Sequence, residues 1–309
     1  MKEQSFRKPS LLKGMRAAWQ LYLLVALPLA YLIIFKYIPM YGAQIAFRDF
    51  SVAKGIWGSK WVGFHYFLRF FRSYDFWNVT RNTVTLSLYQ LIAGFPFPIL
   101  LALSLNYLLH VRFKKTVQLV TYFPHFISTV VMVGIIFQVL DPRIGIVSIA
   151  LRHLGVPPID FLGRAALFPS IYVWSGVWQN MGFGCIIYLA ALSAVDPALH
   201  EAAVVDGASK FQRVFHIDVP GILPIAITIL ILNVARMLDL GFEKAFLMQN
   251  PLNLRTSEII NTYVYKVGIA GQIVNFSYSS AIGLFRNAIN FVLLVIVNQA
   301  ARRTGQSMW

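Results

Sequence analysis

Charged residues are scarce in this sequence. Only 13% of its 309 residues are charged and 58% are hydrophobic, whereas soluble globular proteins average about a quarter charged. This shortage excludes an ordinary soluble fold. Long uncharged apolar runs recur along the chain, and a bilayer is crossed by roughly 20 such residues. The composition therefore predicts a polytopic membrane protein.

Cysteine and acidic residues are also rare. The one cysteine, Cys185, lies inside an apolar run, which excludes a disulfide framework, a thiolate metal cluster and a redox pair. We interpret it as a small buried hydrophobe. The 27 Lys and Arg exceed the 12 Asp and Glu and give a net charge of +15. Because the cations are scattered between apolar runs, they indicate membrane-flanking charge and not a nucleic-acid surface.

Motifs of catalysis are missing as well. The six histidines form no H-E-x-x-H pattern, so a metal hydrolase would lack its ligands. The chain also has no G-x-x-x-x-G-K-[ST] loop that would cradle a nucleotide phosphate. We therefore expect no catalytic residues, no metal site and no nucleotide site in this chain.

The apolar runs set the expected architecture. We predict an all-α protein with six transmembrane helices, at residues 17–35, 82–109, 116–140, 165–195, 219–235 and 281–300. Several contain proline, which membrane helices tolerate because neighbouring groups satisfy the freed carbonyls. The expected organisation is a tail at 1–16, a transmembrane domain at 17–303 and a C-terminal tail at 304–309.

The positive charges indicate the orientation. An even number of spans puts both termini on one side, together with the cations of the tail, of the short loop at 112–115 and of Arg302 and Arg303. Cytoplasmic loops carry the excess of Lys and Arg, so we expect both termini in the cytoplasm. The long first loop is also basic, although long loops weigh less. Its aromatic stretch at 61–77 is typical of an interfacial amphipathic helix.

The segment 196–220, between the fourth and fifth spans, is unlike the other loops. Asp196 is a suitable N-cap before Pro197, Gly207 is a natural helix stop, and Ser209 would cap a second short helix. The first helix places Leu199, Ala202 and Ala203 on one side, and the second carries an apolar face. A short apolar helix-turn-helix on the cytoplasmic side predicts a docking element. An ordinary connecting loop is the alternative, although such loops are polar and usually shorter.

The same segment carries a recognisable pattern. E-A-A-x-x-x-G, followed by nine residues and I-x-x-P, resembles the EAA signature of ABC-importer permeases, with Val219 where leucine is usual. The runs beginning at Thr80, Thr121 and Tyr188 are similar to the maltose-type carbohydrate-uptake family, and more narrowly to its polysaccharide and oligosaccharide permease subgroup. The residues of the expected coupling helix and its flanks are Glu201, Ala202, Ala203, Gly207, Phe211, Phe215, Ile217 and Pro220.

The resemblance implies a permease subunit of a bacterial inner-membrane importer. Its partners would be a second homologous permease, a cytoplasmic ATPase dimer, an external solute-binding protein, membrane lipid and a carbohydrate substrate. ATP and Mg would be bound by the ATPase, not by this chain. An ion-coupled secondary transporter is the alternative, and it predicts carboxylates within the spans. The charge-free second, third and fourth spans argue against it, and a mere scaffold would not need the coupling helix.

Polar groups within the spans are the candidates for the substrate path. Sugars suit a lining of aromatic rings and amides, and the candidates are Tyr172, Trp174, Trp178, Gln179, Asn180, Asn233, Arg236 and Asp239. For the tryptophans, packing or an interfacial belt remains open. For Arg236, a local ion pair with Asp239 remains open beside a sugar contact. The basic outer loop hints at an acidic sugar such as a uronate chain, for which Arg236 would be the partner.

Overall fold

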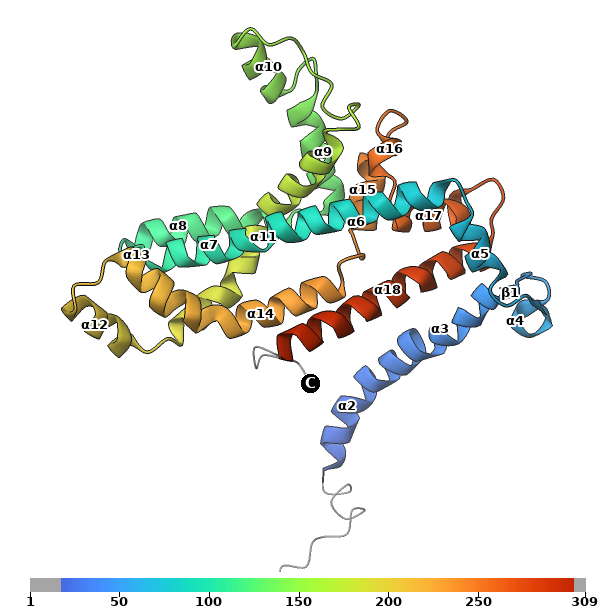
Figure 1. The fold of residues 1–309 in the computed structure, drawn as a ribbon, viewed down its shortest axis with the longest axis horizontal. Helices are drawn as coiled ribbons and strands as arrows, with labels where there is room; N and C mark the ends of the chain where they lie inside the picture. The colour runs from blue at the N-terminus through green and yellow to red at the C-terminus, as the bar shows by residue number, and fades with distance from the viewer. Residues whose placement is uncertain (1–17, 303–309) are drawn as a thin grey trace, which may run out of the picture.

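The computed structural model describes residues 18–302, and they form an almost entirely helical protein (Figure 1). The expected tails at 1–16 and 304–309 lie outside the described residues. The first elements are α2 (Trp19–Leu32), η1 (Ile33–Tyr37), α3 (Ile38–Met40), η2 (Tyr41–Phe47), β1 (Arg48–Asp49), α4 (Gly55–Gly58), β2 (Lys60–Trp61) and α5 (His65–Phe71). The two short strands pair antiparallel, with Arg48 opposite Trp61.

The long helices follow. The central part of the chain contains α6 (Asp75–Gly94), α7 (Pro96–Asn106), α8 (Val111–Tyr122), η3 (Phe123–Phe126), α9 (Thr129–Leu140), α10 (Ile146–His153) and α11 (Phe168–Ser193). The last part contains α12 (Pro197–Val205), α13 (Lys210–Arg213), η4 (Val214–Asp218), α14 (Val219–Ala235), α15 (Phe242–Met248), α16 (Leu254–Ser257), α17 (Ile260–Tyr265), η5 (Lys266–Ala270) and α18 (Phe276–Arg302).

The all-α membrane fold is confirmed, whereas the count of six spans stays a prediction. Within residues 18–302, four continuous helices are long and apolar enough to cross a bilayer: Trp19–Phe47, Asp75–Asn106, Lys210–Ala235 and Phe276–Arg302. Two bent helix pairs raise the number to six if each pair is one span.

The third expected span is not one straight helix. Val111–Phe126 and Thr129–Leu140 meet at an angle of 105°. Pro124 lies in the 3₁₀ turn that ends the first part, and Ser128 has extended backbone and accepts a hydrogen bond from Val131 N as the N-cap of the second. A proline followed by a new capping residue ends one helix and starts another, which is why the apolar run at 116–140 bends.

The fifth span begins earlier than the apolar run suggests. α13, the π-helical turn η4 and α14 form one continuous helix, Lys210–Ala235. Pro220 therefore lies inside a continuous helix, where it removes one backbone N–H, and the wider π turn just before it accommodates the change. The second helix of the docking element is therefore the extension of a candidate membrane span, not a separate short helix.

α11 lies at the centre of the bundle, where it packs against α6, α7, α8 and α14. Small residues permit this close packing. Gly182 lies so close to α8 that an added Cβ would collide with the carbonyl group of Thr121. Cys185 is buried on the same helix and contacts the Tyr122 hydroxyl at 3.7 Å, which confirms its interpretation as a buried hydrophobe.

The aromatic stretch at 61–77 contributes side chains to a hydrophobic core. Its centre forms α5, in which Tyr66 and Phe70 are buried and which packs against α18. Phe64, just before α5, and Trp77, in the first turn of α6, remain exposed. Phe70 lies among aromatic rings, with the Tyr263 and Phe285 centroids 6.3 and 5.6 Å away. The interfacial interpretation stays a prediction for the exposed side chains and does not apply to the others, because they build a core with the last helix.

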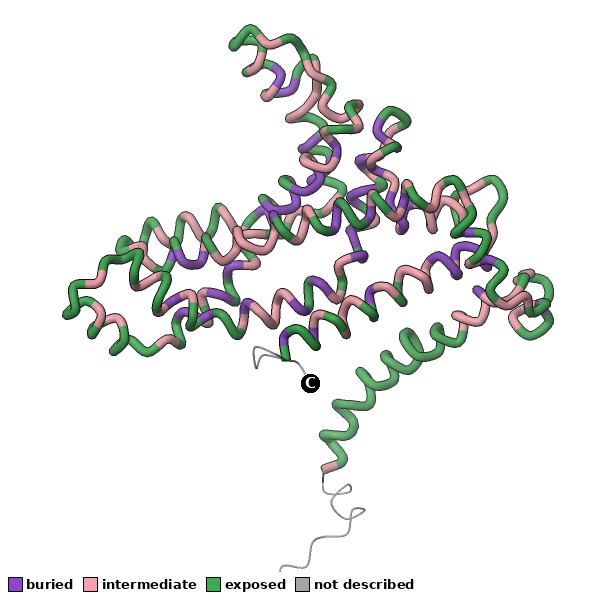
Figure 2. Tube along the Cα trace, in the orientation of Figure 1, coloured by how far each residue is buried: buried purple, intermediate pink, exposed green. Residues whose placement is uncertain are grey.

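The long helices connect two distinct ends of the molecule. Figure 1 shows α12 and α13 at one end, and α4, α5 and the β-ribbon at the opposite end. The basic start of α8 lies at the α12 end, where Tyr107 hydrogen-bonds to Asp218. α2 stands apart from the bundle and is exposed along its length (Figure 2). The segment 196–220 thus lies across the bundle from the basic first loop.

Candidate functional site

The docking element at 196–220 is built by local signals in its own sequence. Asp196 caps α12 by accepting a hydrogen bond from Ala198 N at 2.9 Å. Ser209 caps α13 in a reciprocal capping box with Gln212. Between them, Gly207 has φ +81°, a left-handed conformation that favours glycine. The predicted caps and stop are confirmed, and they set the angle between α12 and the extended fifth span.

The surface of this element is apolar and uncovered. No residue of α12 is buried, and Glu201, Ala202, Leu199 and Phe215 are exposed. Phe211 is 78% exposed. Ala203 and Ile217 are half-buried, and Pro220 is exposed at the base of the segment. Contiguous exposed apolar side chains mark interaction surfaces.

A buried carboxylate ties this element to the bundle. Asp218 is completely buried. One of its oxygens accepts a hydrogen bond from the Tyr107 hydroxyl at 2.7 Å, and the other lies 3.3 Å from His200 Nε2 on α12. Burial and the neighbouring carboxylate raise the pKa of Tyr107 to about 12, so its hydroxyl stays protonated and donates. α7, α12 and the start of α14 therefore meet at one side chain.

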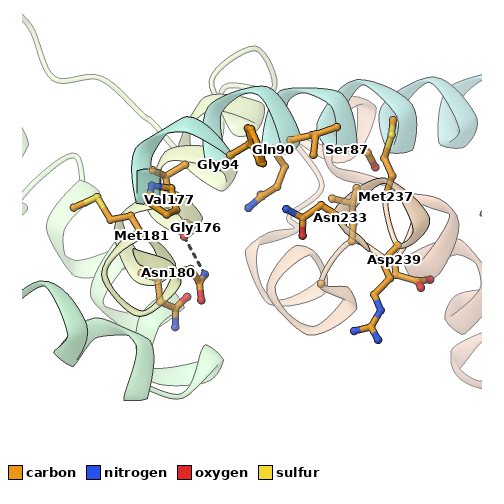
Figure 3. A pocket seen from close by; sticks show the side chains of 18 of the residues that line it. Ser87, Gln90, Gly94, Gly176, Val177, Asn180, Met181, Asn233, Met237 and Asp239 are labelled. Atoms are coloured by element: carbon orange, nitrogen blue, oxygen red, sulfur yellow. Dashed lines mark hydrogen bonds between the residues drawn. The ribbon is translucent and has the colours of Figure 1, made fainter. Parts of the chain in front are cut away.

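The second part of the candidate site is a cavity of about 590 Å³ between α6, α7, α11 and α14, closed on one side by α15. Figure 3 shows Gln90 from α6, Asn180 from α11 and Asn233 from α14 around this space. The Asn180 amide donates to Gly176 O at 3.0 Å, and its carbonyl oxygen lies 3.0 Å from His125 Nδ1. The Gln179 amide donates to Ile127 O at 3.0 Å.

Most of the predicted path residues line this cavity, and two do not. Its lining includes Tyr172, Gln179, Asn180, Asn233, Arg236 and Asp239. Trp174 and Trp178 are outside it. Trp174 donates to the Tyr89 hydroxyl at 2.8 Å and meets Phe97 edge-on, so its role in the structure is packing.

Asp239 pairs with a residue of another helix and not with Arg236. Its carboxylate lies 3.4 Å from Arg286 on α18, and Arg286 also donates to Asn261. Among the ion pairs of residues 18–302, none joins Arg236 to Asp239. The charge in the last span is thus balanced by Asp239, and Arg236 faces the cavity without an acidic partner.

Sequence reasoning missed several polar residues of the cavity, among them Gln90 and Lys244. Lys244 on α15 is 9% exposed; its Nζ donates to Tyr172 O at 2.8 Å and lies 4.8 Å from the centroid of the Tyr172 ring. Burial lowers the pKa of Lys244 to about 8, so it remains mostly protonated at neutral pH. For Gln90, the only sequence feature that could have identified it is an amide within a charge-free span. No sequence feature identifies Lys244, because α15 lies outside the apolar runs.

Comparison with known proteins identifies the family. Residues 82–306 match the binding-protein-dependent transport system inner membrane component. This chain belongs to that family.

Individual relatives cover nearly all of the chain. It is 40% identical over 291 residues to Protein LplB of Bacillus subtilis, covering 94% of this chain and 91% of the relative. It is 40% identical over 301 residues to the polygalacturonan/rhamnogalacturonan transport system permease protein YteP of Bacillus subtilis, covering 97% and 92%.

A solved structure has the same fold. A chain of a bacterial ABC transporter involved in the import of the acidic polysaccharide alginate superposes with a TM-score of 0.88 at 35% identity, covering 95% of this chain and 98% of that one. Family membership confirms the predicted resemblance and a multi-pass membrane permease. It favours the importer over the ion-coupled secondary transporter.

Proposed function

We propose that this chain is the permease subunit of an ATP-driven importer of oligosaccharides or polysaccharides in a bacterial inner membrane. The observation that carries the proposal is the pairing of an uncovered apolar docking element at one end of the bundle with a polar cavity between the spans. Family membership supports the importer class. The substrates named for its relatives, polygalacturonan and alginate, support the saccharide.

The docking element would be the contact with the ATPase. α12 presents Glu201 and an apolar face to a cytoplasmic cleft, while Phe211 and Phe215 project from the extension of the fifth span. Since Lys210–Ala235 is one helix, a displacement of the ATPase would move a cavity-lining span directly. Closure of the ATPase between two states would thus change the side of the membrane to which the cavity opens.

The remaining subunits supply what this chain lacks. ATP and Mg are bound and hydrolysed by the ATPase dimer, a second homologous permease completes the path, and a solute-binding protein delivers the sugar from outside. Both termini and α12 would be cytoplasmic. The substrate contains uronate units, and Arg236 offers a guanidinium fork that fits a carboxylate.

ATP-driven uptake in reconstituted vesicles tests the function. With the complete complex and its binding protein, uptake should need ATP and should resist ionophores. The double variant Gly207→Val and Glu201→Lys should abolish it, because a β-branched residue at φ +81° is strained by about 1–3 kcal/mol and the charge facing the ATPase is reversed.

A second glycine with a positive φ provides a control that distinguishes the effect of backbone strain from the loss of ATPase docking. Gly155 also has a positive φ, +75°, with open space around it, and lies outside the docking element. Gly155→Val should carry the same backbone strain and leave uptake intact. Unchanged uptake in the Gly207 and Glu201 double variant, or ATP-independent uptake that collapses with an ionophore, would overturn the proposed function.

A further inference from the structure

We propose that Lys244 is a second group in the cavity, beside Arg236, that binds carboxylates of an acidic sugar, and that the preference for acidic over neutral saccharides depends on it. The inference rests on the proposed saccharide path and adds a specificity residue to it. The ligand is defined by its chemistry, a carboxylate on a sugar ring.

The position of the ammonium group is the first observation. Lys244 reaches from α15 toward α11, and an added Cβ at Gly176 would lie 3.3 Å from its Nζ and 3.1 Å from the Gln90 amide nitrogen. A glycine on α11 therefore leaves room for a cation and an amide to converge at one wall of the cavity. A side chain at 176 would occupy this space.

Unused hydrogen-bond donors are the second observation. An ammonium group has three N–H donors. The structure gives Lys244 one hydrogen bond, to Tyr172 O at 2.8 Å, and the face of the Tyr172 ring lies 4.8 Å away. The other two donors make no hydrogen bond within residues 18–302, so a ligand oxygen in the cavity would complete the set.

The charge balance is the third observation. Lys244, Arg236 and Asp239 are the charged residues in the cavity lining, and Asp239 is paired with Arg286. Among residues 18–302, no carboxylate forms an ion pair with Lys244 or Arg236. A buried charge is costly unless it is paired. A substrate carboxylate would supply this missing partner, and a neutral sugar would not.

Binding to the purified complex tests the inference. The probes are galacturonate and alginate pentasaccharides, each as the free acid and as its neutral methyl ester, with affinity measured by calorimetry. We expect the wild type to prefer at least one free acid over its ester. Lys244→Met should weaken binding of that acid by about 10- to 100-fold, as expected for a lost charged hydrogen bond, and leave the ester within about twofold.

Two further variants separate charge from structure. Lys244→Arg keeps the charge and should retain part of the preference for the acid. Lys266 is paired with Glu258 at 2.7 Å and is outside the cavity lining, so Lys266→Met removes an equal charge and should leave the preference unchanged.

A measurement on the unmodified protein covers the case in which Lys244→Met does not assemble. The pKa of Lys244, near 8, predicts that the preference for the acid declines between pH 7 and pH 9 as the ammonium group loses its proton. The other titratable groups of the cavity are Tyr172, Tyr188, Arg236 and Asp239. Arginine and tyrosine ordinarily titrate above this range and aspartate below it.

The outcomes distinguish this inference from the proposed function. Equal affinity for acid and ester in the wild type, or a preference that survives Lys244→Met, overturns the role of Lys244 and leaves the saccharide path standing. If none of the four sugars binds, the proposed saccharide path falls as well.

Discussion

The docking element and the cavity are built in opposite ways. The docking element exposes apolar side chains at the end of the bundle, with Phe211 78% exposed, whereas the cavity encloses polar side chains between the spans, with Lys244 buried. Each arrangement is costly in the isolated chain. The difference teaches which kind of contact each region lacks: under the proposed function, a protein partner would cover the first and a polar ligand would fill the second.

The largest expected loss of stability comes from a substitution where α11 packs closely against α8. Gly182→Ala would drive a methyl group into the Thr121 carbonyl of α8. We expect destabilisation at or beyond the upper end of the roughly 1–3 kcal/mol that overpacking costs, because two backbones would have to separate. Gly94→Ala is the control, since no atom lies within 4 Å of an added Cβ there. Thermal unfolding of both variants in detergent measures the effect, and equal melting temperatures would refute the close packing.

Asp218 sharpens the contrast, because it ties the docking element to the end of α7. Asp218→Ala leaves the half-buried Tyr107 hydroxyl without its acceptor and detaches His200. We expect a loss of about 1–3 kcal/mol in stability and fewer sugars transported per ATP hydrolysed. Asp206→Ala removes an exposed carboxylate from the same element and should change neither quantity. A normal transport ratio in Asp218→Ala would show that this contact is structural only.

The exposed phenylalanine gives the smallest effect on stability. Phe211→Ala should change the unfolding free energy by no more than about 0.5 kcal/mol, because the ring has few contacts to lose. It should nevertheless weaken association with the ATPase. Ile144, also 78% exposed, lies outside the docking element and provides the matched control. Co-purification of the ATPase with each variant is the measurement, and equal recovery would contradict docking through Phe211.

The two regions also differ in how far the sequence predicts them. Asp196, Gly207 and Ser209 act on residues two to three positions away, so caps and turns could be recognised without knowing the fold. The cavity depends on tertiary packing. Gln90 and Lys244 are far apart in the chain and meet at Gly176, and the partner of Asp239 is Arg286 on another helix. Hydrophobic patterning carries no information on such pairs.

The spans show the same limit. Apolar runs predicted where helices lie, but not that Ser128 would cap a new helix after a sharp bend. They also placed the start of the fifth span at 219, because Lys210, Arg213 and Asp218 interrupt the apolar pattern while the helix continues through them. Hydropathy detects contact with lipid, and it does not detect a helix that extends beyond the membrane.

Thiol labelling at Phe211 tests the central claim most directly. The variant Phe211→Cys, with Cys185 replaced by alanine, is placed in inside-out vesicles and treated with a membrane-impermeant reagent before and after the ATPase is added. The account predicts rapid labelling of the bare permease and strong protection by the ATPase, with labelling of Ile144→Cys absent under both conditions. No labelling at position 211 in the bare vesicles would contradict the topology, and equal labelling with and without the ATPase would contradict the docking element.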